Sequence, residues 1–145
     1  MEVVPTPTVD PQAIGLYATW GKRFGAWLID AVVVWTAIVL LDRMHIASLG
    51  RYHGLLLIWP VYFTLWHGGE RGQTIGKRIV GIAVRDAASL GRLSYRRSLA
   101  RWLVTALFWV LFVIPGILDG LSPLWRSERR AWHDVMVGSV VIRVE

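Results

Sequence analysis

Apolar residues gather into three long runs along the chain. The first run, residues 24–41, contains 18 residues that are apolar or small except for Asp30 and Thr36. A run of this length predicts a transmembrane helix. A carboxylate inside such a helix costs about 3 kcal/mol or more unless it faces protein, water or a cation. The pattern therefore predicts a membrane protein that holds a charged group in its interior.

The second apolar run, residues 54–66, is shorter. As a helix it measures about 20 Å, whereas the hydrocarbon core of a bilayer is about 30 Å thick. We expect the helix to extend back to Leu49, with the side chains of residues 51–53 reaching the headgroups. Pro60 lies within the run and is expected to kink the helix.

The third run, residues 102–125, is interrupted by Pro115 and Gly116. It forms either one span or a hairpin that turns at these two residues. With a cytoplasmic N-terminus, one span places 10 Lys and Arg residues inside and 6 outside, whereas the hairpin places 14 inside and 2 outside. Because basic residues concentrate on the cytoplasmic side, the hairpin and two cytoplasmic termini are favoured. The returning leg, residues 116–125, is only about 15 Å long, so we expect a turn at mid-depth or a locally thinned bilayer.

Composition narrows the class of protein further. The chain is 54% hydrophobic, has no cysteine and carries a formal net charge of +6. Disulfides and thiolate metal sites are therefore excluded, and the positive charge is typical of cytoplasmic loops rather than of nucleic-acid binding. Residues 1–16 contain prolines but no Lys or Arg, which predicts a disordered tail and not a signal peptide. Residues 17–144 form the predicted membrane domain.

Two short segments rich in β-branched residues, 78–85 and 138–144, predict strands. Each strand alone would leave its backbone unpaired, so we expect the two to pair on the cytoplasmic side. The glycine-rich segment before the first strand does not match a phosphate-binding loop, because Arg71 stands where glycine is needed and Arg78 follows Lys77. Its glycines are expected to form a tight turn at the membrane surface.

Other side chains give weaker signals. The basic residues before the third run are expected to contact anionic lipid headgroups. Two glycines with small-xxx-small spacing predict close helix contact or self-association, and the aspartate between them is expected at the periplasmic turn. Histidines lack ligand spacing and no nucleophile motif is present, so we expect no metal, no cofactor and no enzymatic activity. The basic residues are Arg96, Arg97 and Arg101, and the glycines are Gly116 and Gly120 around Asp119.

The chain resembles the RDD family, small bacterial integral membrane proteins named for an Arg and two Asp. The resemblance covers residues 17–144 and depends on Arg23, Asp30, Arg101 and Asp134, together with the segments GQTIGKRIVGIAVRD and RRAWHDVMVGSVVI. It implies a multi-pass protein of the bacterial inner membrane. The expected fold is an all-α bundle of three to four transmembrane segments with a small cytoplasmic two-stranded β element. Transport roles, including cation/proton antiport, have been suggested for family members.

The family's charged residues suggest an ion network. Arg23 and Asp30 share one helix face but lie about 10 Å apart along the axis, too far for direct contact. We expect Arg23 to pair with Asp134, and Asp30 to find Arg101 or water. Two functions remain open: a structural or accessory subunit that binds other membrane proteins, or a transporter or cation/proton exchanger that uses Asp30. The exchanger would have to oligomerise, because four short helices enclose no pathway.

Overall fold

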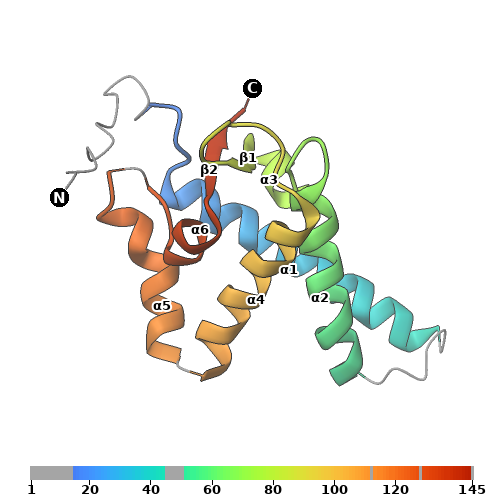
Figure 1. Cartoon of the computed structure of the whole chain (residues 1–145). Coiled ribbons are helices and arrows are strands. Elements are labelled where there is room, and N and C mark those ends of the chain that lie inside the picture. Colours follow the sequence, from blue (N-terminus) through green and yellow to red (C-terminus); the bar gives the residue numbers. More distant parts are fainter. Residues whose placement is uncertain (1–14, 45–50, 112, 128, 145) are drawn as a thin grey trace.

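The computed structural model describes residues 15–44, 51–111, 113–127 and 129–144, except for the side chains of residues 51–56. The predicted tail therefore lies outside the described residues up to position 14. The described chain is mostly helical and carries one small sheet (Figure 1). This confirms the predicted helical class with a small β element.

Helix α1 (Trp20–Arg43) is the one helix in the described part of the chain that is long and apolar enough to cross a membrane. Its buried residues, Ala26, Asp30, Val34 and Ile38, recur every four positions. One stripe of the helix therefore faces protein, and the other faces expose large apolar side chains such as Trp27. The first predicted membrane helix is confirmed as a helix of membrane-spanning length and composition.

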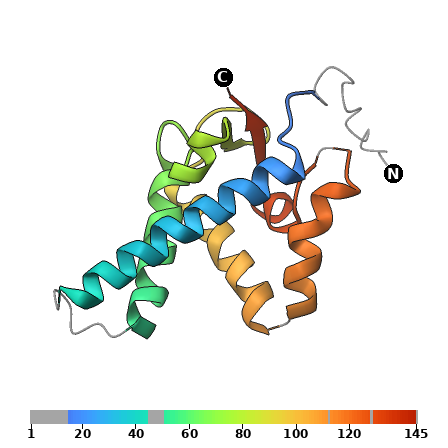
Figure 2. The same cartoon turned by 180° about the vertical axis from the view of Figure 1, so that it is seen from behind.

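Helices α2 (Arg51–Gly68) and α4 (Tyr95–Leu111) meet near the sheet and diverge away from it (Figures 1 and 2). Pro60 lies inside α2 without ending it. Aromatic rings line this helix: Trp59 stacks on Phe63, and Tyr62 meets Phe63 edge to face. The second apolar run therefore forms the helix expected of it as far back as residue 51, and residues 45–50 lie outside the described residues.

Helix α4 is followed by an antiparallel helix, α5 (Val113–Leu121), and a 3-10 turn, η2 (Ser122–Leu124). The expected turn at Pro115 and Gly116 is wrong, because α5 has already begun at Val113. Proline is tolerated in the first turn of a helix, where its missing N–H would have no intrahelical partner. The returning leg therefore runs through residues 113–124, about 18 Å of helix.

The strands β1 (Ile82–Asp86) and β2 (Ser139–Arg143) pair antiparallel, with Val84 opposite Val141. This confirms the predicted pairing of the two segments. Ala18 donates its N–H to the carbonyl of Val141, and Arg143 donates to that of Leu16. The segment at residues 16–18 therefore covers the other edge of β2. Behind the sheet lies a small apolar core: Ala18, Ala26, Ile82, Val84, Leu93 and Val141.

Two short helices precede the strands: α3 (Ile75–Ile79) and α6 (Trp132–Val137). The predicted first strand began too early, because residues 78 and 79 belong to α3. Thr74 caps this helix by accepting the N–H of Lys77 with its hydroxyl group. Gly81, with a φ of +67°, turns the chain into β1, and Gly138, with a φ of +66°, ends α6. We call α3, β1, α6, β2 and residues 16–18 the cap.

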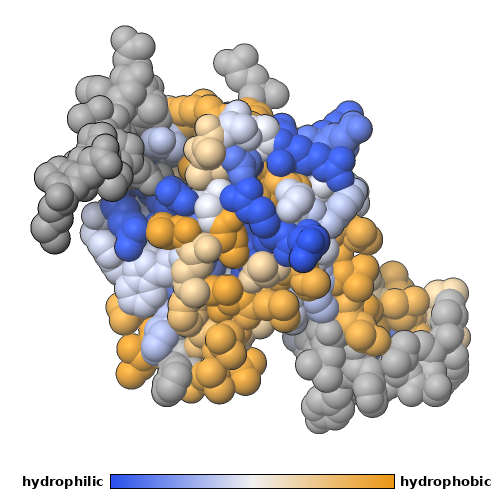
Figure 3. All heavy atoms as spheres, in the orientation of Figure 1, coloured by the Kyte–Doolittle hydropathy of each residue, from blue (hydrophilic) through white to orange (hydrophobic). Residues whose placement is uncertain are grey.

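Polarity divides the molecular surface. In Figure 3, hydrophilic residues gather around the cap, and hydrophobic residues dominate the end reached by the α4–α5 hairpin. At that end Val110 is 81% exposed and Ile114 is 71% exposed. Large apolar side chains this exposed are costly in water and suit a lipid environment. The surface therefore has the division expected of helices in lipid beneath a polar cap.

Candidate functional site

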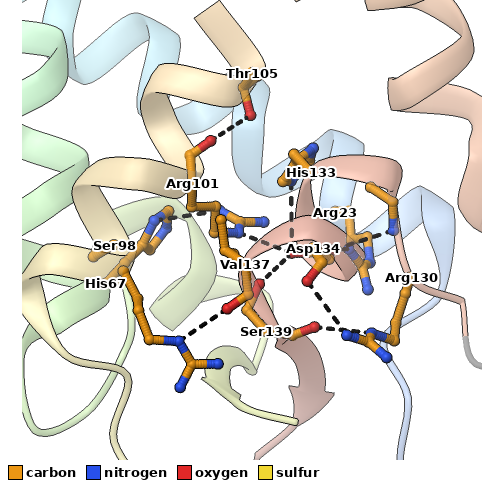
Figure 4. A network of polar contacts seen from close by, with 12 residues as sticks. Arg23, His67, Ser98, Arg101, Thr105, Arg130, His133, Asp134, Val137 and Ser139 are labelled. Atoms are coloured by element: carbon orange, nitrogen blue, oxygen red, sulfur yellow. Dashed lines mark hydrogen bonds and ion pairs between the residues drawn. The ribbon is translucent and has the colours of Figure 1, made fainter.

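Asp134, in the first turn of α6, is fully buried between two arginines. Arg23 of α1 places Nη1 2.7 Å from Oδ2, and Arg101 of α4 places Nε 2.8 Å from Oδ1 (Figure 4). Burial alone raises the pKa of Asp134. The charges of Arg101, His133 and Arg23 outweigh it and hold that pKa well below its usual range. The carboxylate is therefore ionised and joins three helices.

Further donors complete the coordination of Asp134. The Ser139 hydroxyl group lies 2.8 Å from Oδ1, and the Ala131 N–H reaches Oδ2 at 3.2 Å. Arg130 binds the carbonyls of Asp134 and Ser139, on either side of the α6–β2 junction. Because Asp134 is the third residue of α6, its side chain can reach back to the N–H that precedes the helix. Both carboxylate oxygens are thereby used to fix α6 in place.

Asp30, also fully buried, has a different set of partners. Its Oδ1 accepts hydrogen bonds from the Tyr62 hydroxyl group and the Gly76 N–H, both at 2.8 Å, and its Oδ2 accepts the Thr74 hydroxyl group at 2.6 Å. Arg101 was one of the two expected partners of Asp30, but the structure gives it to Asp134 instead. The carboxylate therefore joins α1 to α2 and to the start of α3 through uncharged donors.

Gly76 explains how α3 approaches α1 so closely. A Cβ at this position would lie 2.1 Å from the carbonyl oxygen of Ala26 and 2.9 Å from Oδ1 of Asp30. Any other residue would push α3 away from α1 and remove the hydrogen bond to Asp30. This glycine of the GQTIGK segment thus serves helix packing.

Lys77 follows directly and is almost completely buried, 8% exposed. Its Nζ lies 5.8 Å from the centre of the Phe63 ring. Burial, followed by the charges of Arg101 and Arg23, lowers the pKa of Lys77 to about 7 against the opposing charges of Asp30 and Asp134. Sequence reasoning missed this lysine, because nothing in the basic segment around it distinguishes a buried side chain from a solvated one.

Asp119, near the end of α5, is buried beside the cap. It accepts the N–H of His133 at 2.9 Å, and its other oxygen lies 2.6 Å from Nδ1 of the same histidine. The expected position at a periplasmic turn is therefore wrong, since the hairpin turn lies at the other end of α5. Both residues flank the Asp134 site, because His133 Nε2 lies 3.6 Å from Oδ1 of Asp134.

Comparison with known proteins places the chain in a family. The model of the RDD family matches residues 17–138, most of the chain. This protein belongs to the RDD family. A relative from Haemophilus influenzae, described as an uncharacterized protein, is 27% identical over 126 residues, which cover 86% of this chain and 76% of the relative. No solved structure matches. Family membership and the apolar helix α1 together fit a membrane protein.

The two glycines predicted to serve helix packing lie differently in this RDD protein. A Cβ at Gly116 would lie 2.9 Å from the Trp109 ring, so this glycine packs within the α4–α5 hairpin. At Gly120 the Cβ position is open, and its carbonyl accepts the indole N–H of Trp20 at 2.9 Å. The start of α1 and the end of α5 are thereby held together.

The arginines at the start of α4 also differ from one another. Arg97 donates to the carboxylate of Asp86 and to the carbonyls of Val137 and Gly138, and Arg101 binds Asp134. Arg96 is exposed. Contact with lipid headgroups therefore stays a prediction that suits Arg96 best. In the described part of this RDD protein, no group of three or more His, Asp or Glu residues is placed to hold a metal ion.

Proposed function

We propose that this RDD protein is a structural or accessory subunit that binds other membrane proteins in the bacterial inner membrane. The observation that carries the proposal is the hydrogen bonding of Asp30 and Asp134. All four carboxylate oxygens accept bonds from the protein's own donors. Carboxylates whose oxygens are all occupied in this way are suited to holding elements together.

The topology that we propose is multi-pass, with both termini in the cytoplasm. The first and last described segments support it, because residues 16–18 are hydrogen-bonded to β2, and segments bonded in this way lie on the same side of a membrane. The basic residues gathered in and around the cap favour the cytoplasmic side. Helices α1, α2, α4 and α5 are the proposed membrane segments, and the shortness of α5 calls for a thinned bilayer around the hairpin.

Single cysteines test the topology cleanly, since the chain contains none of its own. Met44→Cys marks the end of α1 away from the cap, and Ser89→Cys marks the turn after β1; both positions are exposed. We expect a membrane-impermeant thiol reagent to label position 44 in intact cells, and position 89 only after permeabilisation. The opposite pattern would refute the proposed orientation.

The surface for a partner is proposed on the apolar helices. Leu107 of α4 is 53% exposed and Trp35 of α1 is 46% exposed, and membrane proteins associate through such lipid-facing surfaces by close packing. A photocrosslinking amino acid at position 107 should give a discrete adduct with another membrane protein, whereas the same probe at position 89 should not. Absence of any adduct from positions on α1, α4 and α5 would contradict the accessory role.

Exchange of a cation for a proton at Asp30 is the second candidate, and Lys77 favours it. Its buried amine, with a pKa of about 7, can gain or lose a proton at physiological pH close to Asp30. Under this function, wild-type proteoliposomes should show cation-dependent proton flux, and Asp30→Asn should abolish that flux while still inserting. Wild-type liposomes without flux would exclude the exchanger and leave the accessory role standing.

A further inference from the structure

Three arginines surround one opening on the cap. Arg71 comes from the segment before α3, Arg78 from α3 and Arg85 from β1, and they line a cavity of about 490 Å³ together with Gln73, Gly81 and Val144. Arg85 donates to the carbonyl of Glu70 at 2.9 Å. Within the part of the chain that the structure describes, none of the three pairs with a carboxylate.

Besides the bond from Arg85 to Glu70, contacts without an arginine hold the walls of this cavity. Val84 donates its N–H to the carbonyl of Gly72 at 2.7 Å, and the Gln73 amide donates to the carbonyl of Ile82 at 3.0 Å. Gly72 has a φ of +58°, and a Cβ there would lie 2.2 Å from the carbonyl oxygen of Val84. The segment is therefore pressed against β1 by contacts that require no positive charge.

The charge of the cavity contrasts with the interior of the protein. Arg23 and Arg101 are compensated by Asp134, whereas the three cavity arginines gather from separate segments without an acidic partner among the described residues. Like charges around one opening repel each other and raise the local concentration of anions. Guanidinium groups match the oxygens of a phosphate with paired, charge-assisted hydrogen bonds.

We propose that this cavity binds a phosphate group through Arg71, Arg78 and Arg85. Its volume lies within the range of small-molecule sites, and side chains, not the amides of a glycine loop, make the contacts. Gly72 and Gly76 are occupied in packing against Val84 and Ala26, which agrees with the failure of the phosphate-loop spacing. The phosphate belongs either to an anionic lipid headgroup or to a soluble phosphorylated compound.

The test uses the full chain in detergent with inorganic phosphate as the probe, titrated calorimetrically. We expect Arg71→Gln/Arg78→Gln to weaken phosphate binding about tenfold or more, since it removes two of three charged donors. Arg126→Gln is the matched control, because Arg126 is exposed and lies outside the cavity. It should bind phosphate as the wild type does. Arg71→Gln alone repeats the test if the double variant does not fold.

Nanodiscs distinguish the two sources of the phosphate. If phosphatidylglycerol discs suppress the binding of inorganic phosphate and phosphatidylcholine discs do not, the cavity holds an anionic headgroup. If binding is equal in both discs, the ligand is a soluble phosphate compound. The proposal is overturned if wild-type protein binds inorganic phosphate in neither detergent nor discs, or if Arg126→Gln weakens binding as much as the double variant does.

Discussion

The two buried aspartates of this protein are stabilised in different ways. Asp134 touches two arginines, whereas Asp30 is bonded to two hydroxyl groups and one backbone N–H. The arginines fix the charge of Asp134. The charge of Lys77, whose pKa is about 7, interacts with both aspartates, and more strongly with Asp30 than with Asp134. Equal burial of the same side chain thus occurs once with charged donors and once with uncharged donors.

Asp134→Asn should have the largest effect on stability. It leaves Arg23 and Arg101 buried beside a neutral amide, and breaking a buried pair from one side costs about 3–5 kcal/mol. We expect a strong loss of folded protein, measured by the thermal unfolding of detergent-purified samples. An unchanged melting temperature would mean that the arginines do not depend on Asp134.

Asp30→Asn should lower the free energy of unfolding less, by about 1–3 kcal/mol. The asparagine side chain keeps one oxygen that accepts hydrogen bonds, so only some of the three donors to Asp30 lose their acceptor. Tyr62→Phe is the comparison, since it removes one donor to Asp30 and the acceptor of the Ile75 N–H, at about 1 kcal/mol for each hydrogen bond. The same unfolding assay compares both with wild type. A loss from Asp30→Asn that equals or exceeds that of Asp134→Asn would reverse the contrast between the two sites.

Lys77→Met tests the proton response of the Asp30 site. The pKa of Lys77 is about 7 in the folded protein, against an ordinary value of 10.5, so the unfolded chain binds more protons between these two limits. The contribution of Lys77 to the free energy of unfolding should therefore rise with pH between about 7 and 10.5, by up to about 1.4 kcal/mol per pH unit. Denaturant unfolding at several pH values across the window should show this rise in wild type but not in Lys77→Met. Parallel curves for the two proteins would argue against a buried titrating lysine.

Asp86→Asn should have the smallest effect on folding stability. It is the reference against which the two buried aspartates are compared. This carboxylate is near the surface, where it pairs with the partly exposed Arg97 and accepts the N–H groups of Ala88 and Ser89. Asparagine preserves an acceptor for the turn, so we expect a loss below about 1 kcal/mol. The Ser89 N–H and then Arg97 lower the pKa of Asp86 to about 2. Its contribution should therefore be lost only as the pH falls from about 4 to 2, which acid unfolding of both proteins measures.

Local sequence patterns predicted which helices and strands form better than they predicted where these elements begin and end. The long apolar run gave α1, and the two β-branched segments gave a strand pair, because both signals depend on side chains within one element. The position of the hairpin turn was wrong, since Pro115 acts equally well as a breaker and as a first-turn residue. Helix α3 was missed although Thr74 is a typical N-cap, because the apolar run after it favoured a strand.

The charged residues were selected by family resemblance, and their partners were only partly predictable. The pairing of Arg23 with Asp134 was expected. Tyr62 and Thr74, the partners of Asp30, come from segments with no spacing relation to it in the sequence. Likewise, His133 and Asp119 have no spacing relation in the sequence that predicts their contact. Contacts between distant segments depend on packing, which local patterns do not encode.

The distance in sequence between Arg23 and its acceptor has a consequence for biogenesis. The two residues lie 111 positions apart, so the ribosome delivers α1 to the translocon long before Asp134 has been synthesised. During that interval Arg23 lacks the carboxylate that later compensates it, and the edge of the sheet at residues 16–18 lacks its strand. The nascent chain must therefore keep Arg23 without its carboxylate until the last segment arrives, and termination before α6 leaves both Arg23 and Arg101 without Asp134.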